Sequence, residues 1–149
     1  MDAVLSLCAG FLLAVLWFDL MFDVQALTGD DAPVPEEALA SIAAYYRRVT
    51  TRARPMSYLV AVVMLVMVGG TLLQLVRDGS PPALRLGALV LCGVPIAAAL
   101  VRTFPNAVRL GARVDSPAVQ SRLARAICRD HLVFFPAIVA FALIQLVAL

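Results

Sequence analysis

The sequence predicts an all-α fold: an integral membrane four-helix bundle, up-down-up-down, with helical extensions on the cytoplasmic side. Composition gives the first indication, because the 149 residues are 62% hydrophobic and only 15% charged, whereas soluble domains carry about 25% charged residues. Length gives the second: four apolar stretches each approach the roughly 20 residues that cross a hydrocarbon core about 30 Å thick. The third is that arginines gather in alternate connections, as they do in multi-pass proteins.

The four predicted spans cover about residues 3–27, 56–76, 84–101 and 132–149, and the whole chain forms a single transmembrane domain. The first stretch has no basic leader and no small-residue cleavage site, so it is predicted to be a retained span. The long connections are predicted to be helical, because Pro35 and Pro117 stand where helices begin. Pro55 either kinks a continuous helix or marks the start of the second span.

The arginine distribution predicts the orientation of the bundle. Residues 28–55 hold four arginines and residues 102–131 hold six, whereas residues 77–85 hold two. Cytoplasmic loops are the ones rich in arginine. We therefore expect a multi-pass protein of a bacterial-type inner (plasma) membrane, with both termini outside the cytoplasm.

Two carboxylates interrupt the first span in the stretch WFDLMFD, which contains Asp19 and Asp23. Their spacing of four residues places both on one face of a helix. Sixteen residues from Ala3 place Asp19 about 24 Å across the core, roughly one turn inside its boundary, and Asp23 near the interface. A carboxylate that faces lipid is costly, so both are predicted to face a polar chamber on the cytoplasmic side.

The candidate site consists of polar residues predicted at that same depth. Asp19 is expected to be the more enclosed carboxylate and to pair with Arg102, Arg129 or protonated His131. His131 is the only histidine of the chain and can titrate near neutral pH. The candidate catalytic residues are His131, Asp19 and Asn106, and the candidate ligand-binding residues are Asp23, Tyr58, Arg102 and Arg129.

A purely structural interpretation explains the same residues. Asp19 and Asp23 can bridge to arginines and fix helix packing, and His131 can bond a backbone carbonyl. Trp17, Tyr45 and Tyr46 are then anchors in an aromatic belt at the membrane interface, and most arginines contact lipid phosphates.

Three functions remain open from the residues. The leading one is a small membrane protein whose chamber binds an amphipathic or lipid-like ligand or docks a partner. The others are a membrane-embedded oxygenase or oxidoreductase that uses His131 and Asp19, and an accessory subunit of a larger membrane complex. Nothing specifies a cofactor, and no metal site is assigned because the Glu-x-x-His pairs of di-iron bundles are absent.

The expected partners are those of a membrane protein. Membrane lipids surround the spans, and small residues allow a homo-oligomer or a place in a larger complex. A net charge of +2 without a basic block does not indicate nucleic acid as a partner. The small residues are Gly69, Gly70, Gly87 and Gly93.

The last third of the chain resembles a known family. TFPNAVRLG, followed some twenty residues later by RDHLVFFPAIVAFAL, is similar to elements of the small four-span DUF1772 (anthrone-oxygenase-like) membrane proteins. The matching positions are Pro105, Asn106, Leu110, Arg129 and His131. Here Pro and Asn are adjacent, the order of His and Arg is altered, and the tryptophan that usually precedes the histidine is absent. The resemblance implies a cofactor-independent oxygenase or another membrane enzyme.

The predicted orientation can be tested with a reporter enzyme that is active only outside the cytoplasm. Because both termini are expected there, a fusion after Leu149 should be active. Enzyme activity of the fusion is the measurement. A fusion that is active only with a cytoplasmic reporter would contradict the predicted topology.

Overall fold

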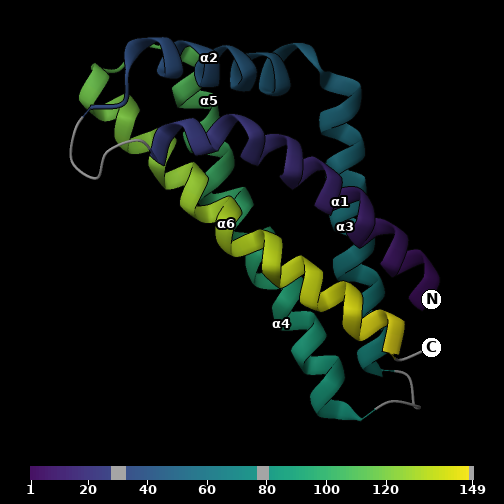
Figure 1. Ribbon diagram of the computed structural model, residues 1–149. Coiled ribbons are helices and arrows are strands. Elements are labelled where there is room, and N and C mark those ends of the chain that lie inside the picture. Colours follow the sequence, from purple (N-terminus) through teal and green to yellow (C-terminus); the bar gives the residue numbers. More distant parts are fainter. Residues whose placement is uncertain (28–32, 77–80, 148–149) are drawn as a thin grey trace.

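The computed structural model is all-helical and describes residues 1–27, 33–76 and 81–147. Four long helical segments pack together, consecutive ones running in opposite directions, and α2 lies across one end of them (Figure 1). Each long segment is long and apolar enough to cross a membrane. The predicted up-down-up-down bundle is therefore confirmed, whereas Arg77 and Leu149 lie outside the described residues.

Each long segment begins and ends close to the predicted boundaries of a span or of its extension. The first segment is α1 followed by a 3₁₀ turn, and the third is α4 and α5 joined by a π-helical segment, η3. The second is α3 and the fourth is α6. The helices are α1 (Asp2–Asp23), α2 (Glu36–Arg47), α3 (Arg54–Val76), α4 (Pro82–Ala98), η3 (Ala99–Thr103), α5 (Phe104–Ala112) and α6 (Pro117–Val147).

The four segments form a ring in which α1 contacts α6, α6 contacts α4, α4 contacts α3, and α3 contacts α1. Both termini lie at one end of this ring, and α2 and α5 lie at the other (Figure 1). We call the latter the α2 end. An even number of spans places the termini on the same side, as the sequence predicts.

The extension before the second span differs from the expected straight continuation. The chain leaves helical geometry at Ala53, with φ −89° and ψ 42°, and turns from α2 into α3 (Figure 1). Pro55 lies in the first turn of α3, where its missing N–H has no helical partner to lose. It therefore marks the start of the span, and α2 is free to cover the end of the bundle.

Close backbone contact holds α2 in that position. A Cβ added to Gly111 of α5 would lie 2.8 Å from the backbone nitrogen of Arg47, so only glycine allows this approach. Beside this contact, Leu39 and Ile42 of α2 are buried together with Ile127 of α6 in one apolar cluster. Helix α2, which caps this end of the bundle, is thus a packed part of the fold.

The outer surface of the spans is apolar. Leu65 is 73% exposed and Leu7 is 76% exposed, as expected for side chains that face lipid. Of the glycines proposed for self-association, Gly70 already packs against Leu5 within the chain, whereas a Cβ at Gly69 would meet nothing within 4 Å. Gly70 therefore serves the packing of α1 on α3.

Candidate functional site

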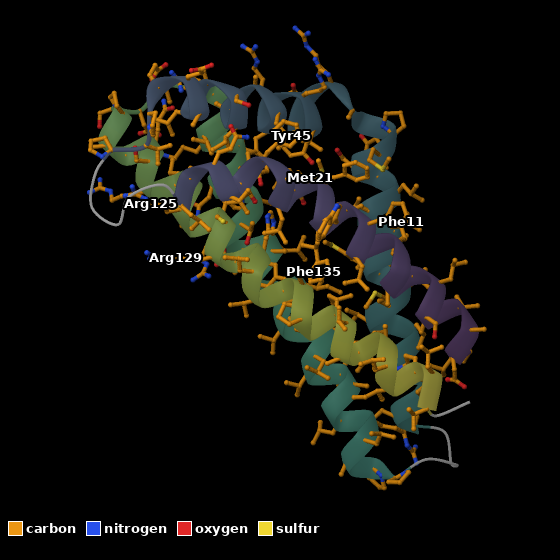
Figure 2. The ribbon with its side chains drawn as sticks, viewed as in Figure 1. Phe11, Met21, Tyr45, Arg125, Arg129 and Phe135 are labelled. Carbon is orange, nitrogen blue, oxygen red and sulfur yellow. The ribbon has the colours of Figure 1, made fainter. Side chains whose placement is uncertain are left out.

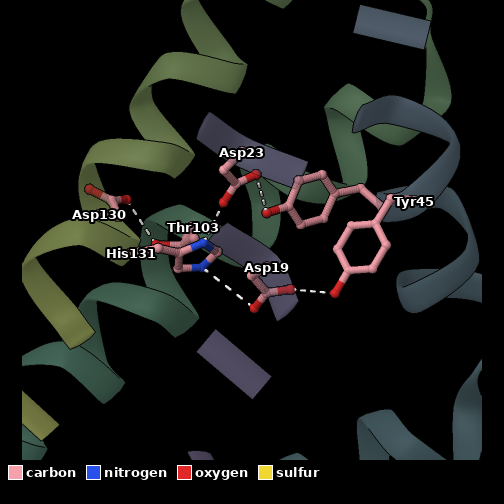
Figure 3. Close-up of polar contacts among 7 residues, drawn as sticks. Asp19, Asp23, Tyr45, Thr103, Asp130 and His131 are labelled. Carbon is pink, nitrogen blue, oxygen red and sulfur yellow. Dashed lines mark hydrogen bonds and ion pairs between the residues drawn. The ribbon is translucent and has the colours of Figure 1, made fainter. Parts of the chain in front are cut away.

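Three helices bring a polar network together at the α2 end (Figure 3). Asp19 and Asp23 project from one face of α1, as their spacing predicts. Tyr45 and Tyr46 come from the last turn of α2, and His131 comes from α6. The network exists because α2 crosses the end of the bundle and places its tyrosines over the two carboxylates.

Asp23 is the enclosed centre of the network. Its side chain is fully buried, and it accepts a hydrogen bond of 2.7 Å from the Tyr46 hydroxyl. Its other oxygen lies 2.7 Å from Nδ1 of His131. A carboxylate has only acceptors to offer, so this contact assigns the Nδ1 proton to the histidine. Asp23 thereby sets both the tautomer and the orientation of the imidazole ring.

Asp19 lies one turn nearer the middle of the bundle and is less enclosed. Its side chain is 14% exposed, and it accepts a hydrogen bond of 2.6 Å from the Tyr45 hydroxyl. Its second oxygen, Oδ2, lies 3.9 Å from Nε2 of His131, which exceeds hydrogen-bond length. The carboxylate and the second imidazole nitrogen are therefore neighbours without a direct hydrogen bond.

The two tyrosines act as fixed donors. Burial raises the pKa of both Tyr45 and Tyr46, and the negative charges of Asp19 and Asp23 raise the pKa further. Both phenols therefore stay protonated. The Tyr45 ring also stacks on Phe22, with ring centroids 4.2 Å apart and an interplanar angle of 9°, which holds its hydroxyl over α1.

A pocket of about 590 Å³ lies beside this network, between the spans and below α2. Asp19 and His131 are part of its wall, whereas Asp23 stands behind them and does not line it. Most of the remaining wall is apolar. The apolar lining includes Leu12, Leu16, Val60, Met64, Ile96, Phe134 and Ile138.

The pocket reaches the outer surface, because several of its lining side chains are exposed, Phe18 on α1 among them. Three of its lining residues, Tyr58 on α3, Leu100 on η3 and Phe104 on α5, are 67%, 59% and 52% exposed. Because these helices are candidate spans, this side faces the bilayer when the chain is inserted. The pocket therefore has a polar inner wall and a mouth flanked by lipid-facing side chains.

A second polar network stands on the other side of α6. The Asp130 carboxylate accepts hydrogen bonds from Nε of Arg102, at 3.0 Å, and from the Thr103 hydroxyl, at 2.8 Å. Its side chain is 1% exposed, whereas that of Arg102 is 62% exposed. The charge of Arg102 is therefore matched by Asp130, and η3 is tied to α6.

The structure brings some of the predicted site residues together and separates others. Asp19, Asp23 and His131 form the network, and Tyr58 lines the mouth of the pocket. Arg102 pairs with Asp130 in place of Asp19. Three residues lie elsewhere: Asn106 is half-buried and does not line the pocket, Arg129 is exposed on the outer side of α6 (Figure 2), and Pro105 is exposed.

Three sequence-based interpretations are corrected. Asp23, and not Asp19, is the more enclosed carboxylate, because α2 covers the end of α1. His131 bonds a carboxylate where a backbone carbonyl was the structural alternative. Tyr46 is only 4% exposed and donates to Asp23, so it is a member of the network where an interface anchor was expected.

Asp130 was missed, although a signal exists in the sequence. It directly precedes His131, and consecutive helical residues point about 100° apart, so one of the two had to face another neighbour.

Among the described residues, no group of three or more His, Cys, Asp or Glu side chains is arranged to hold a metal ion.

No protein-family model, curated protein or solved structure matches this chain. The resemblance to the anthrone-oxygenase-like proteins therefore stays a prediction from the residues at Pro105, Asn106, Leu110, Arg129 and His131. A function must therefore be inferred from the geometry of the polar network and the pocket beside it.

The burial of the two carboxylates predicts unequal effects of their removal. In Asp23→Asn the amide oxygen still accepts from Tyr46, but the Nδ1 proton of His131 loses its charged acceptor, and the ring must change tautomer to bond the amide nitrogen. The lost hydrogen bond to a charged acceptor is worth about 1.5–3 kcal/mol. Asp19→Asn keeps an acceptor for Tyr45 and should cost about 1 kcal/mol.

Thermal unfolding of the purified chain in a non-ionic detergent measures the difference. Glu37→Gln, which removes an exposed carboxylate of α2, is the matched control and should leave the unfolding temperature unchanged. A larger loss of stability in Asp19→Asn than in Asp23→Asn would contradict the burial order described above.

Proposed function

We propose that the protein binds an amphipathic, lipid-like ligand in the pocket, with the polar head of the ligand against Asp19 and His131. The observation that carries the proposal is the pocket itself, which combines a volume of about 590 Å³ with an apolar wall that turns polar at one end. Small-molecule sites typically measure about 300–1,000 Å³ and carry a few convergent polar groups on an apolar lining.

The position of the mouth supports a ligand that comes from the bilayer. The exposed side chains of Tyr58, Leu100 and Phe104 flank it at the outer surface of candidate spans. A molecule dissolved in the bilayer reaches the pocket through this side without crossing the polar cap. Its apolar part then remains among apolar side chains while its head reaches the network.

The same proposal includes an orientation in a bacterial-type inner membrane. Its support is the arginine bias of the sequence together with the fold. Both termini lie at one end, and α2 and α5 lie at the other, within the connections 28–55 and 102–131 that hold four and six arginines. With arginine-rich connections in the cytoplasm, the polar head of the ligand is bound near the cytoplasmic boundary.

The bond between Asp23 and His131 favours a second candidate function, a membrane-embedded enzyme. A carboxylate that holds Nδ1–H leaves Nε2 free to accept a proton, which is the arrangement of a histidine general base. His131 would be the base, and Asp19 would position the substrate. If the wild-type protein chemically converts a bound ligand and His131→Gln does not, the protein is an enzyme and not only a binding protein.

Photo-crosslinking tests the binding proposal. The protein in phosphatidylcholine nanodiscs is irradiated with a dodecyl alcohol that carries a diazirine near the end of its chain. Adducts on pocket residues such as Met64 and Phe134 should disappear when unlabelled dodecanol is added in excess. Probe dissolved in the bilayer also labels side chains that face outward. Excess dodecanol should reduce this labelling much less, because the bilayer has no limited number of sites to saturate.

Two variants of neighbouring alanines give the matched comparison. Ala99 lines the pocket, so Ala99→Phe fills it and should remove the saturable adducts. Ala97 is exposed in the adjoining helix α4 and does not line the pocket, so Ala97→Phe should keep them. Adducts on Met64 and Phe134 that dodecanol does not displace, or that persist in Ala99→Phe, would overturn the proposal.

A further inference from the structure

The polar wall of the pocket presents hydrogen-bond acceptors to a bound molecule. Each hydroxyl has one proton, and once that proton is donated only lone pairs remain. Apart from Tyr58 at the exposed mouth, every described hydroxyl of the lining already donates elsewhere in the chain. Tyr45 donates to Asp19, Tyr46 to Asp23, Thr103 to Asp130, Ser57 to the carbonyl of Val49, and Thr50 to the carbonyl of Tyr46.

The two innermost atoms of the wall are acceptors as well. Asp23 holds the proton of His131 on Nδ1, at 2.7 Å, and in this tautomer Nε2 carries the lone pair of the ring. Nε2 stands 3.9 Å from Oδ2 of Asp19. A nitrogen about 2.8–3.0 Å from each of these atoms fits the gap and donates to both.

The charges around the gap favour a cation. The titratable groups that face Asp19 are Asp23 on its own helix, Tyr45 and Tyr46 on α2, and His131 on α6. Across the pocket, α3 contributes Tyr58, and the cation of η3, Arg102, is bound to Asp130. The site therefore holds two carboxylates against one imidazole, a surplus of negative charge in an apolar pocket where charge interactions are strong.

We infer that the ligand is an amphipathic amine whose protonated nitrogen lies between Asp19 and His131. This inference rests on the proposed function and adds the chemical class of the head group. The ammonium donates one N–H to the carboxylate and one to Nε2, and its charge matches the surplus of the site. The alkyl or aromatic part of the amine fills the apolar part of the pocket. An acceptor-only or anionic head finds no donor on this wall.

Competition for the saturable diazirine adducts tests the head group. Dodecylamine, dodecanol, dodecanoate and dodecyltrimethylammonium carry different heads on similar chains, and each is compared in zwitterionic nanodiscs at equal concentration in the bilayer. Hydrogen bonds to charged groups are worth about 1.5–3 kcal/mol. Dodecylamine should therefore compete at a concentration at least about tenfold lower than dodecanol. Dodecanoate should be weaker than dodecanol.

The quaternary amine separates charge from hydrogen bonding, because it has no N–H to donate and should compete less well than dodecylamine. Asp19→Asn should remove the preference for dodecylamine and retain competition by dodecanol, which shows that its pocket is intact. Glu37→Gln removes an exposed carboxylate and should keep the full preference.

The outcomes separate the two proposals. Dodecanol or dodecanoate that competes as well as dodecylamine would overturn the amine inference and leave the pocket proposal standing. Equal potency of the quaternary amine, or an unchanged preference in Asp19→Asn, would also overturn it. Adducts that none of the four compounds displaces would overturn both.

Discussion

The burial of Asp23 is the constraint on which the rest of the structure depends. A carboxylate without hydrogen-bond partners is costly away from water, and this one is fully buried near the end of an apolar helix. Its two partners come from different parts of the chain, Tyr46 on α2 and His131 on α6. The fold must therefore place α2 across the bundle. The close contact of Gly111 with the backbone of Arg47 makes that placement achievable.

Two consecutive residues of α6 make polar contacts with different neighbours. His131 turns toward α1 and meets Asp23, whereas Asp130 turns toward η3 and meets Arg102 and Thr103. Each of these bonds fixes the rotation of α6 about its axis. With the ring of His131 fixed in this way, one nitrogen faces the buried carboxylate and the other faces the pocket. A ligand in the pocket thus meets a preorganised surface beside Asp19.

The spans were predictable because hydropathy over some twenty residues reports directly on the lipid environment. The placement of Asp19 and Asp23 on one inward face followed from helical periodicity and the cost of a lipid-facing charge. Which of the two carboxylates is more buried could not be predicted in this way, because a depth counted along α1 takes no account of a helix that covers the end of α1. The roles of Tyr45 and Tyr46 depend on the bend at Ala53, which is a tertiary feature. The partner of Asp130 depends on how α6 is rotated about its axis. The hydrophobic periodicity of the sequence does not determine this rotation near the boundary of a span.

The central claim is that Asp23 holds the proton of His131 on Nδ1 and leaves Nε2 toward the pocket. Nitrogen NMR of protein labelled with ¹⁵N-histidine tests it most directly, because the chain has a single histidine and hence one pair of ring signals. At mildly alkaline pH the wild-type protein should show a protonated Nδ1 and an unprotonated Nε2, and Asp23→Asn should shift the ring toward the opposite tautomer. A wild-type ring with an unprotonated Nδ1 would contradict the account.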